Sequence, residues 1–165
     1  MAALQIAVAD SPFPSLDPIR KVVSRIDGEV QLAADATPEA ILRVAKDADA
    51  VLVTYGQITG DIIRQLTKSR IISRMGIGTD NIDIEAATKA GIVVTKVPDY
   101  CIDEVSDHAM ALLLAVVRKI PFINAQVHGG TWEMPAVVPI HRLRGSVLCL
   151  MGFGRIPQLL APKAK

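Results

Sequence analysis

The chain has 165 residues and a formal net charge of +1; half of its residues are apolar, 21% are charged and 4% are aromatic. This length supports one domain with a full core but is short for two. Balanced, scattered charge and few aromatic residues argue against a nucleic-acid partner. The longest apolar run, residues 109–117, is about half a membrane span, so we expect no membrane partner either.

Cysteine and histidine positions suggest neither a disulfide framework nor a metal site. Cys101 and Cys149 lie far apart in unlike contexts, and His108, His128 and His141 fall on different predicted elements. The N-terminus has no basic stretch followed by a long apolar one, as a signal peptide would. We therefore expect a reduced, cytoplasmic protein that binds no metal.

The first hundred residues alternate short apolar runs with helical patterns. We predict strands over residues 4–9, 29–33, 50–54, 70–74 and 92–97, with helices between them that begin at the N-caps Asp17, Thr37, Thr59 and Asp83. This alternation predicts a doubly wound parallel sheet with helices on both faces. The continuous apolar run over 50–54 is typical of a strand that is covered on both faces.

The character of the sequence changes after Pro98. We predict one long helix over 102–120, apolar on every side in its middle and therefore buried all round, either in a domain core or at an interface. A second helix is predicted over 122–127, an irregular stretch over 134–144, and a strand over 147–151.

Two glycine pairs follow predicted strands. Gly152-x-Gly154 is typical of a strand that turns into a helix whose N-terminus holds a pyrophosphate, although such glycines also occur in plain strand–turn–helix units. Pro157 stands where a third glycine is usual, at a first-turn position that tolerates proline. A dinucleotide-binding unit needs about thirty residues, and eleven follow Gly154, so we expect the front part of an enzyme.

The other pair, Gly76 and Gly78, follows the fourth strand at the edge of the sheet where open α/β folds bind ligands. Its backbone amides can converge on an anion such as a carboxylate, or the glycines can serve a tight turn alone. A phosphoacceptor receiver, the other function common on such a sheet, needs an aspartate after the third strand. That strand ends in Thr54-Tyr55-Gly56, which excludes a receiver.

Four segments together resemble the D-isomer-specific 2-hydroxyacid dehydrogenase family. They are Arg74-Met75-Gly76-Ile77-Gly78-Thr79-Asp80-Asn81-Ile82-Asp83, Val97-Pro98-Asp99-Tyr100, residues 104–108 and residues 147–156. The resemblance implies a flavodoxin-like substrate domain over 1–98. Residues 99–165 would then hold a long interdomain helix and the first strand of a truncated Rossmann domain.

The resemblance also implies site residues. Those expected to bind substrate are Tyr55, Gly56, Gly76, Ile77 and Gly78, and those expected to bind the cofactor are Ile77, Val105, Gly152, Gly154, Arg155 and Ile156. The family's catalytic arginine, glutamate and histidine would lie beyond Lys165, so no catalytic residue is assigned in this chain.

The implied activity is NAD- or NADP-dependent interconversion of a small 2-hydroxy acid and a 2-oxo acid, in a homodimer formed through the NAD-domain side. We expect the chain alone to be inactive, to bind the cofactor weakly, and to self-associate through its apolar strand and helix. A second interpretation is a binding module that keeps the fold without catalysis, as corepressor relatives do.

Overall fold

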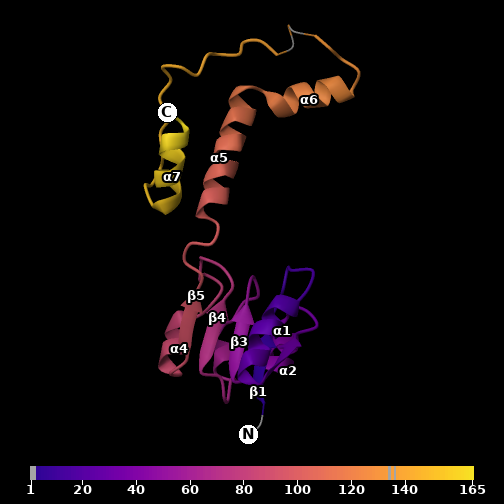
Figure 1. The fold of residues 1–165 in the computed structure, drawn as a ribbon, viewed down its shortest axis with the longest axis vertical. Helices are drawn as coiled ribbons and strands as arrows, with labels where there is room; N and C mark the ends of the chain where they lie inside the picture. Colours follow the sequence, from indigo (N-terminus) through magenta and orange to yellow (C-terminus); the bar gives the residue numbers. More distant parts are fainter. Residues whose placement is uncertain (1–2, 134, 136) are drawn as a thin grey trace. The chain divides into compact units, whose positions relative to one another are not determined.

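A computed structural model describes residues 3–133, 135 and 137–165 of the chain (Figure 1). The chain divides into two compact units, Met1–Tyr100 and Cys101–Lys165. The first unit is an α/β domain, and the described part of the second is helical.

The first unit is built on five parallel strands in the order β2-β1-β3-β4-β5. Their bounds are β1 Leu4–Val8, β2 Gly28–Leu32, β3 Ala50–Val53, β4 Ile71–Arg74 and β5 Val93–Lys96. Flavodoxin-like folds have this strand order. The chain adds β2 on one side of β1 and then crosses back to add β3, β4 and β5 on the other side. The predicted flavodoxin-like, doubly wound parallel sheet is confirmed.

Short helices connect the strands, and three of them begin where capping residues predict. The four connecting helices are α1 Asp17–Val23, followed by a 3₁₀ turn over Ser24–Ile26, then α2 Pro38–Ala45, α3 Gly60–Ile63 and α4 Ile84–Lys89. Thr37 accepts a hydrogen bond from the Ala40 N–H (3.3 Å). Thr59 and Asp83 accept likewise from Ile62 (3.4 Å) and Ala86 (2.9 Å). Each side chain satisfies one N–H that a helix start leaves without a partner.

The predicted N-cap Asp17 is wrong. Asp17 is the first residue of α1, and Leu16 is the N-cap, without a side-chain cap. The Asp17 N–H instead donates to the Ser15 hydroxyl (3.0 Å), which forms the local turn that an N-cap aspartate would otherwise supply.

The main core lies on one face of the sheet. Ala7, Val51, Val53 and Ile72 point to that face and pack against α2, α3 and α4 in a cluster of buried side chains. The largest buried helix residues are Ile41, Ile62 and Ile63. Ile6 and Val8 alternate to the opposite face, as a strand requires, and lie outside that cluster.

The third strand is covered less fully than its apolar sequence predicts. Val51 and Val53 are buried, whereas Ala50 and Leu52 on the other face are only half-buried. On that face β5 exposes Val93 to 59%. The right-handed crossover from β1 to β2 puts α1 on the same face as Ala50 and Leu52. Because β2 lies on the far side of β1 from β4 and β5, α1 leaves this face of β3, β4 and β5 largely uncovered.

The second unit contains three helices in its described residues, α5 Ile102–Val117, α6 Ile120–His128 and α7 Arg155–Lys163. The prediction of one helix over 102–120 is wrong at its end. Lys119 adopts a left-handed conformation (φ 53°) and α6 begins at Ile120. Pro121 causes this break, because it lacks the N–H that would continue the ladder of α5. The predicted second helix is confirmed.

The long helix packs along α7 but is not buried all round within its unit. Lys163 of α7 contacts the buried Ser106 hydroxyl (2.5 Å) and the Asp107 carboxylate of α5. Leu112 and Val116 remain 54% and 70% exposed. In the described residues no single helix is long and apolar enough to cross a membrane, and α5 with α6 matches only as a pair bent by 64°.

The predicted strand over 147–151 does not form. Residues 146–150 have no regular secondary structure, and Val147 and Met151 are almost fully exposed. A strand exists only where a neighbour accepts and donates its backbone hydrogen bonds, and no described segment of this unit pairs with it. The irregular stretch predicted over 134–144 is confirmed for residues 138–143; Met134 and Ala136 lie outside the described residues.

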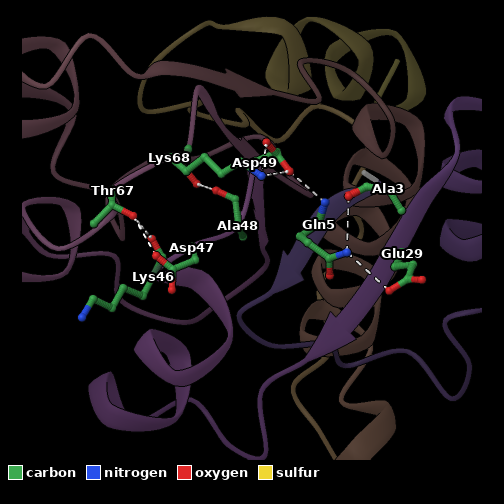
Figure 2. A network of polar contacts seen from close by, with 10 residues as sticks. Ala3, Gln5, Glu29, Lys46, Asp47, Ala48, Asp49, Thr67 and Lys68 are labelled. Atoms are coloured by element: carbon green, nitrogen blue, oxygen red, sulfur yellow. Dashed lines mark hydrogen bonds and ion pairs between the residues drawn. The ribbon is translucent and has the colours of Figure 1, made fainter. Parts of the chain in front are cut away.

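A polar network joins β1 and β3 at the amino-terminal edge of the sheet. The Gln5 N–H donates to the Asp49 carboxylate (2.9 Å), which also pairs with Lys68 (3.0 Å; Figure 2). The Asp49 N–H in turn donates to the Gln5 carbonyl (2.8 Å). The Gln5 hydrogen bond, followed by the Lys68 contacts, holds the pKa of Asp49 below its ordinary value of 3.8.

A lowered pKa makes the Asp49 contribution to stability depend on pH. The contribution is complete above pH 3.8 and disappears as the pH falls through the lower folded-state pKa. Urea unfolding should therefore show Asp49→Asn to be less stable than the parent chain at pH 6, with the gap closing below pH 3.8. Glu85→Gln, which breaks an exposed ion pair with Lys89, is the control. Its loss of unfolding free energy at pH 6 should be small, and that loss should change less on acidification than the loss for Asp49→Asn. A gap for Asp49→Asn that widened in acid would contradict this assignment.

Candidate functional site

The loops after β3 and β4 are joined to each other at the carboxyl edge of the sheet. Ile58 and Ile82 form a parallel bridge, in which the Ile58 N–H donates to the Asn81 carbonyl (2.8 Å) and the Asp83 N–H to the Ile58 carbonyl (3.0 Å). The Val97 N–H after β5 donates to the Gly76 carbonyl (3.1 Å). The segment 76–83, which begins with the glycine loop over residues 76–78, is thus held from both sides: at residues 81–83 by the loop after β3 and at Gly76 by the residue after β5.

Two side chains hold the turn at Thr54-Tyr55-Gly56. Asp10, two residues after the end of β1, accepts the N–H groups of Thr54 and Tyr55 on its two carboxylate oxygens, each at 2.8 Å. Asn81 donates from its side-chain amide to the carbonyls of Gly56 (2.8 Å) and Thr54 (3.4 Å). Side chains therefore pair two N–H groups and two carbonyls of the turn.

A cavity of about 250 Å³ opens at this edge. Its lining residues are Thr54, Tyr55, Gln57, Arg74, Gly78, Asp80 and Asn81. The lining is polar except for the Tyr55 ring, which is 69% exposed. Such a cavity suits a small polar molecule rather than an apolar one.

Two buried polar atoms beside the cavity have no hydrogen-bond partner in the described chain: the hydroxyl Oγ1 of Thr54 and Nε of Arg74. Buried polar groups are nearly always paired, so these two atoms are exceptions within the described residues. Arg74 ends β4, and a side chain at Gly76 would overlap its guanidinium, which therefore lies over the glycine loop. An oxyanion at this point could accept from Arg74 and from Thr54.

The structure brings the five residues of the predicted substrate site to one edge of the sheet. Tyr55 and Gly78 line the cavity, Gly56 and Gly76 are buried next to it, and Ile77 lies half-buried between the glycines. Their role in binding stays a prediction. The predicted site omitted Arg74, whose signal was its place at a strand end directly before the glycine loop.

The second glycine pair leads into a helix as predicted. Gly152 is left-handed (φ +83°), Gly154 is the N-cap of α7, and Arg155 and Ile156 form its first turn. A side chain on Gly154 would meet no atom within 4 Å, so there is open space in front of the helix start. Helix N-termini with free space before them suit phosphate groups. Val105, the other predicted cofactor contact in this unit, is 41% exposed on α5.

No group of three or more His, Cys, Asp or Glu side chains within residues 3–133, 135 and 137–165 is arranged to hold a metal ion. The chemistry that these residues offer is that of anion binding: backbone amides of glycine turns, one arginine and one hydroxyl.

The sequence pattern of the D-isomer specific 2-hydroxyacid dehydrogenase catalytic domain matches residues 6–151. The chain belongs to this family. The D-3-phosphoglycerate dehydrogenase of Methanocaldococcus jannaschii is 40% identical over 139 residues, which are 84% of this chain and 26% of that protein. The glyoxylate reductase of Thermococcus litoralis is 38% identical over 147 residues, which are 83% of this chain and 44% of that protein.

Solved structures of the family agree in fold. An NADPH-dependent glyoxylate/hydroxypyruvate reductase of Sinorhizobium meliloti, in complex with NADP and malonate, is similar with a TM-score of 0.80 at 26% identity. The match covers 98% of this chain and 50% of that one. The chain thus spans between a quarter and about half of the length of these relatives.

The two glycines before α7 should respond differently to alanine. Gly152→Ala places a side chain at φ +83°, a conformation that disfavours L-residues by about 1–2 kcal/mol, and should destabilise the second unit by about 1 kcal/mol. Gly154→Ala, at φ −77° in open space, is the matched control and should cost less than half as much. Urea unfolding followed by far-UV circular dichroism compares them; equal losses would refute the left-handed turn.

Proposed function

We propose that the chain is the substrate-binding part, with the start of the cofactor-binding part, of an NAD(P)-dependent oxidoreductase that interconverts a 2-hydroxy acid and a 2-oxo acid. The observation that carries this proposal is the glycine loop, with the Arg74 guanidinium packed over Gly76, at the edge of a cavity that Arg74 and Gly78 line. Family membership supports the same chemistry, as do relatives named as glyoxylate reductase and phosphoglycerate dehydrogenase.

In this proposal the carboxylate of the acid lies against the glycine loop. The amides of Gly76, Ile77 and Gly78 donate to it, and the absence of side chains at the two glycines lets the backbone approach closely. Arg74 supplies the positive charge and Tyr55 closes the open side of the cavity. Several fixed donors on one small anion orient the substrate as well as hold it.

The cofactor's place in the second unit is the turn at Gly152–Ile156. The amides of Arg155 and Ile156 at the start of α7 fit a pyrophosphate, and Gly152 and Gly154 leave room for it. When bound, the nicotinamide group supplies or accepts the hydride. Val105 and Ile77 are assigned to the nicotinamide side by resemblance alone.

Hydride transfer requires a proton donor and a second charged group, and we assign neither to a described residue of this chain, which spans between a quarter and about half of the length of its relatives. We therefore expect the 165-residue chain to bind the acid weakly, to bind NAD or NADP weakly and to show no turnover. The parent is proposed to be a cytoplasmic homodimer; Cys101 and Cys149 are both free thiols, as in a reducing compartment.

The test is a titration of the ¹⁵N-labelled chain with oxamate, a stable analogue of a 2-oxo acid. Amide shifts should move first at Gly76, Ile77 and Gly78, with a dissociation constant in the millimolar range, about 4 kcal/mol of binding free energy. Arg74→Gln should weaken binding about tenfold, because a charge-assisted contact is lost. Far-UV circular dichroism checks that Arg74→Gln stays folded, since the Arg74 guanidinium packs over Gly76.

Acetamide, which lacks the carboxylate, is the ligand control and should cause no shifts at the loop. An oxamate response confined to other parts of the chain, or an undiminished response in Arg74→Gln, would refute the assignment of this cavity to the acid. Oxidation of NADH with glyoxylate by the pure chain would refute the expected inactivity.

A further inference from the structure

The turn that forms one wall of the cavity has a support from outside the cavity. Asp10 lies after β1 and is absent from the cavity lining, yet both of its carboxylate oxygens bind backbone N–H groups of the turn, at Thr54 and Tyr55. These two residues line the cavity. Asp10 therefore contacts the site through the backbone that it holds, and not through the cavity itself.

The turn needs this support because strand pairing ends just before it. β3 ends at Val53. The last backbone hydrogen bonds on its two sides are from the Ala9 N–H to the Leu52 carbonyl (2.8 Å) and from the Met75 N–H to the Val53 carbonyl (2.8 Å). Beyond them, the Thr54 and Tyr55 amides have the Asp10 carboxylate as their partner. Two N–H groups on one carboxylate fix the direction of both peptide planes.

We propose that Asp10 is a positioning residue for substrate: it holds the turn so that Thr54 and the Tyr55 ring keep their places in the wall of the cavity, next to the acid bound at the glycine loop. Asn81 completes the support from the opposite side through the carbonyls of Thr54 and Gly56. A side chain on Gly56 would approach the Asp10 Oδ1 atom to 3.2 Å, which shows how closely the carboxylate and the turn are packed. The inference rests on the proposed function, because it assumes the same acid site.

Charge and geometry predict opposite effects for Asp10→Asn, which makes the variant informative. Removing a negative charge near an anion site favours anion binding by Coulomb's law. Losing one of the two N–H acceptors instead loosens the wall, because an asparagine offers a single oxygen and turns its own N–H groups toward the other donor. The proposal therefore predicts weaker binding against the electrostatic trend.

The experiment is the oxamate titration of the ¹⁵N-labelled 165-residue chain with three variants. Asp10→Asn should raise the dissociation constant at least fivefold and speed hydrogen exchange of the Thr54 and Tyr55 amides. Asn81→Ala should also raise the dissociation constant at least fivefold and shift the Gly56 amide.

Asp49→Asn is the matched control. It removes the same charge from the same strand pair at the opposite edge, where Asp49 also accepts an N–H across 44 residues. It should lower stability and leave oxamate binding unchanged, which separates positioning from a general loss of stability.

The outcomes distinguish the two proposals. If the unsubstituted chain binds oxamate and Asp10→Asn binds it equally or more tightly, the positioning role is overturned and the acid site stands. If the glycine-loop amides of the unsubstituted chain do not respond to oxamate, the acid site is overturned, and the positioning role is overturned with it. If Asp10→Asn does not fold, Asn81→Ala decides alone: binding equal to that of the parent overturns the support of the turn.

Discussion

Parallel pairing of β3 with β1 on one side and β4 on the other is the constraint on which the candidate site depends. In a parallel sheet every strand delivers its carboxyl end to the same edge. Asp10, Thr54 and the glycine loop are far apart in the sequence, yet the registers of these three strands bring them together. A slip of one residue in either pairing would reverse the faces of the buried valines and scatter the site.

Where the strands stop, the backbone N–H and C=O groups of the turns no longer have hydrogen-bond partners in a neighbouring strand. Side chains supply the missing partners on one side of the turn after β3, through Asp10 and Asn81. They leave the Thr54 hydroxyl and one Arg74 nitrogen unpartnered beside it. Because side chains hold the backbone of this turn, the residues that line the cavity keep fixed positions without strand pairing.

Local chemistry made much of the first unit predictable. Thr37, Thr59 and Asp83 are caps because each offers an oxygen one turn before an N–H. The apolar runs predicted five parallel strands, whereas the flavodoxin-like arrangement was implied by the family resemblance. The predicted site omitted Arg74 although its place before the glycine loop was visible in the sequence, because the packing of its guanidinium over Gly76 is a contact that no local pattern records. The break before α6 was readable from Pro121, whereas a purely apolar periodicity hides it.

The segment over 147–151 shows the limit of sequence patterns most clearly. Its apolar residues and following glycines match a buried strand in every local respect, and α7 begins where that pattern predicts. The strand itself is absent because β structure is completed by a neighbour, whereas a helix closes its own hydrogen bonds. Helical parts of the second unit therefore follow from their own residues, but Val147 and Met151 can be ordered as a strand only where another strand pairs with them.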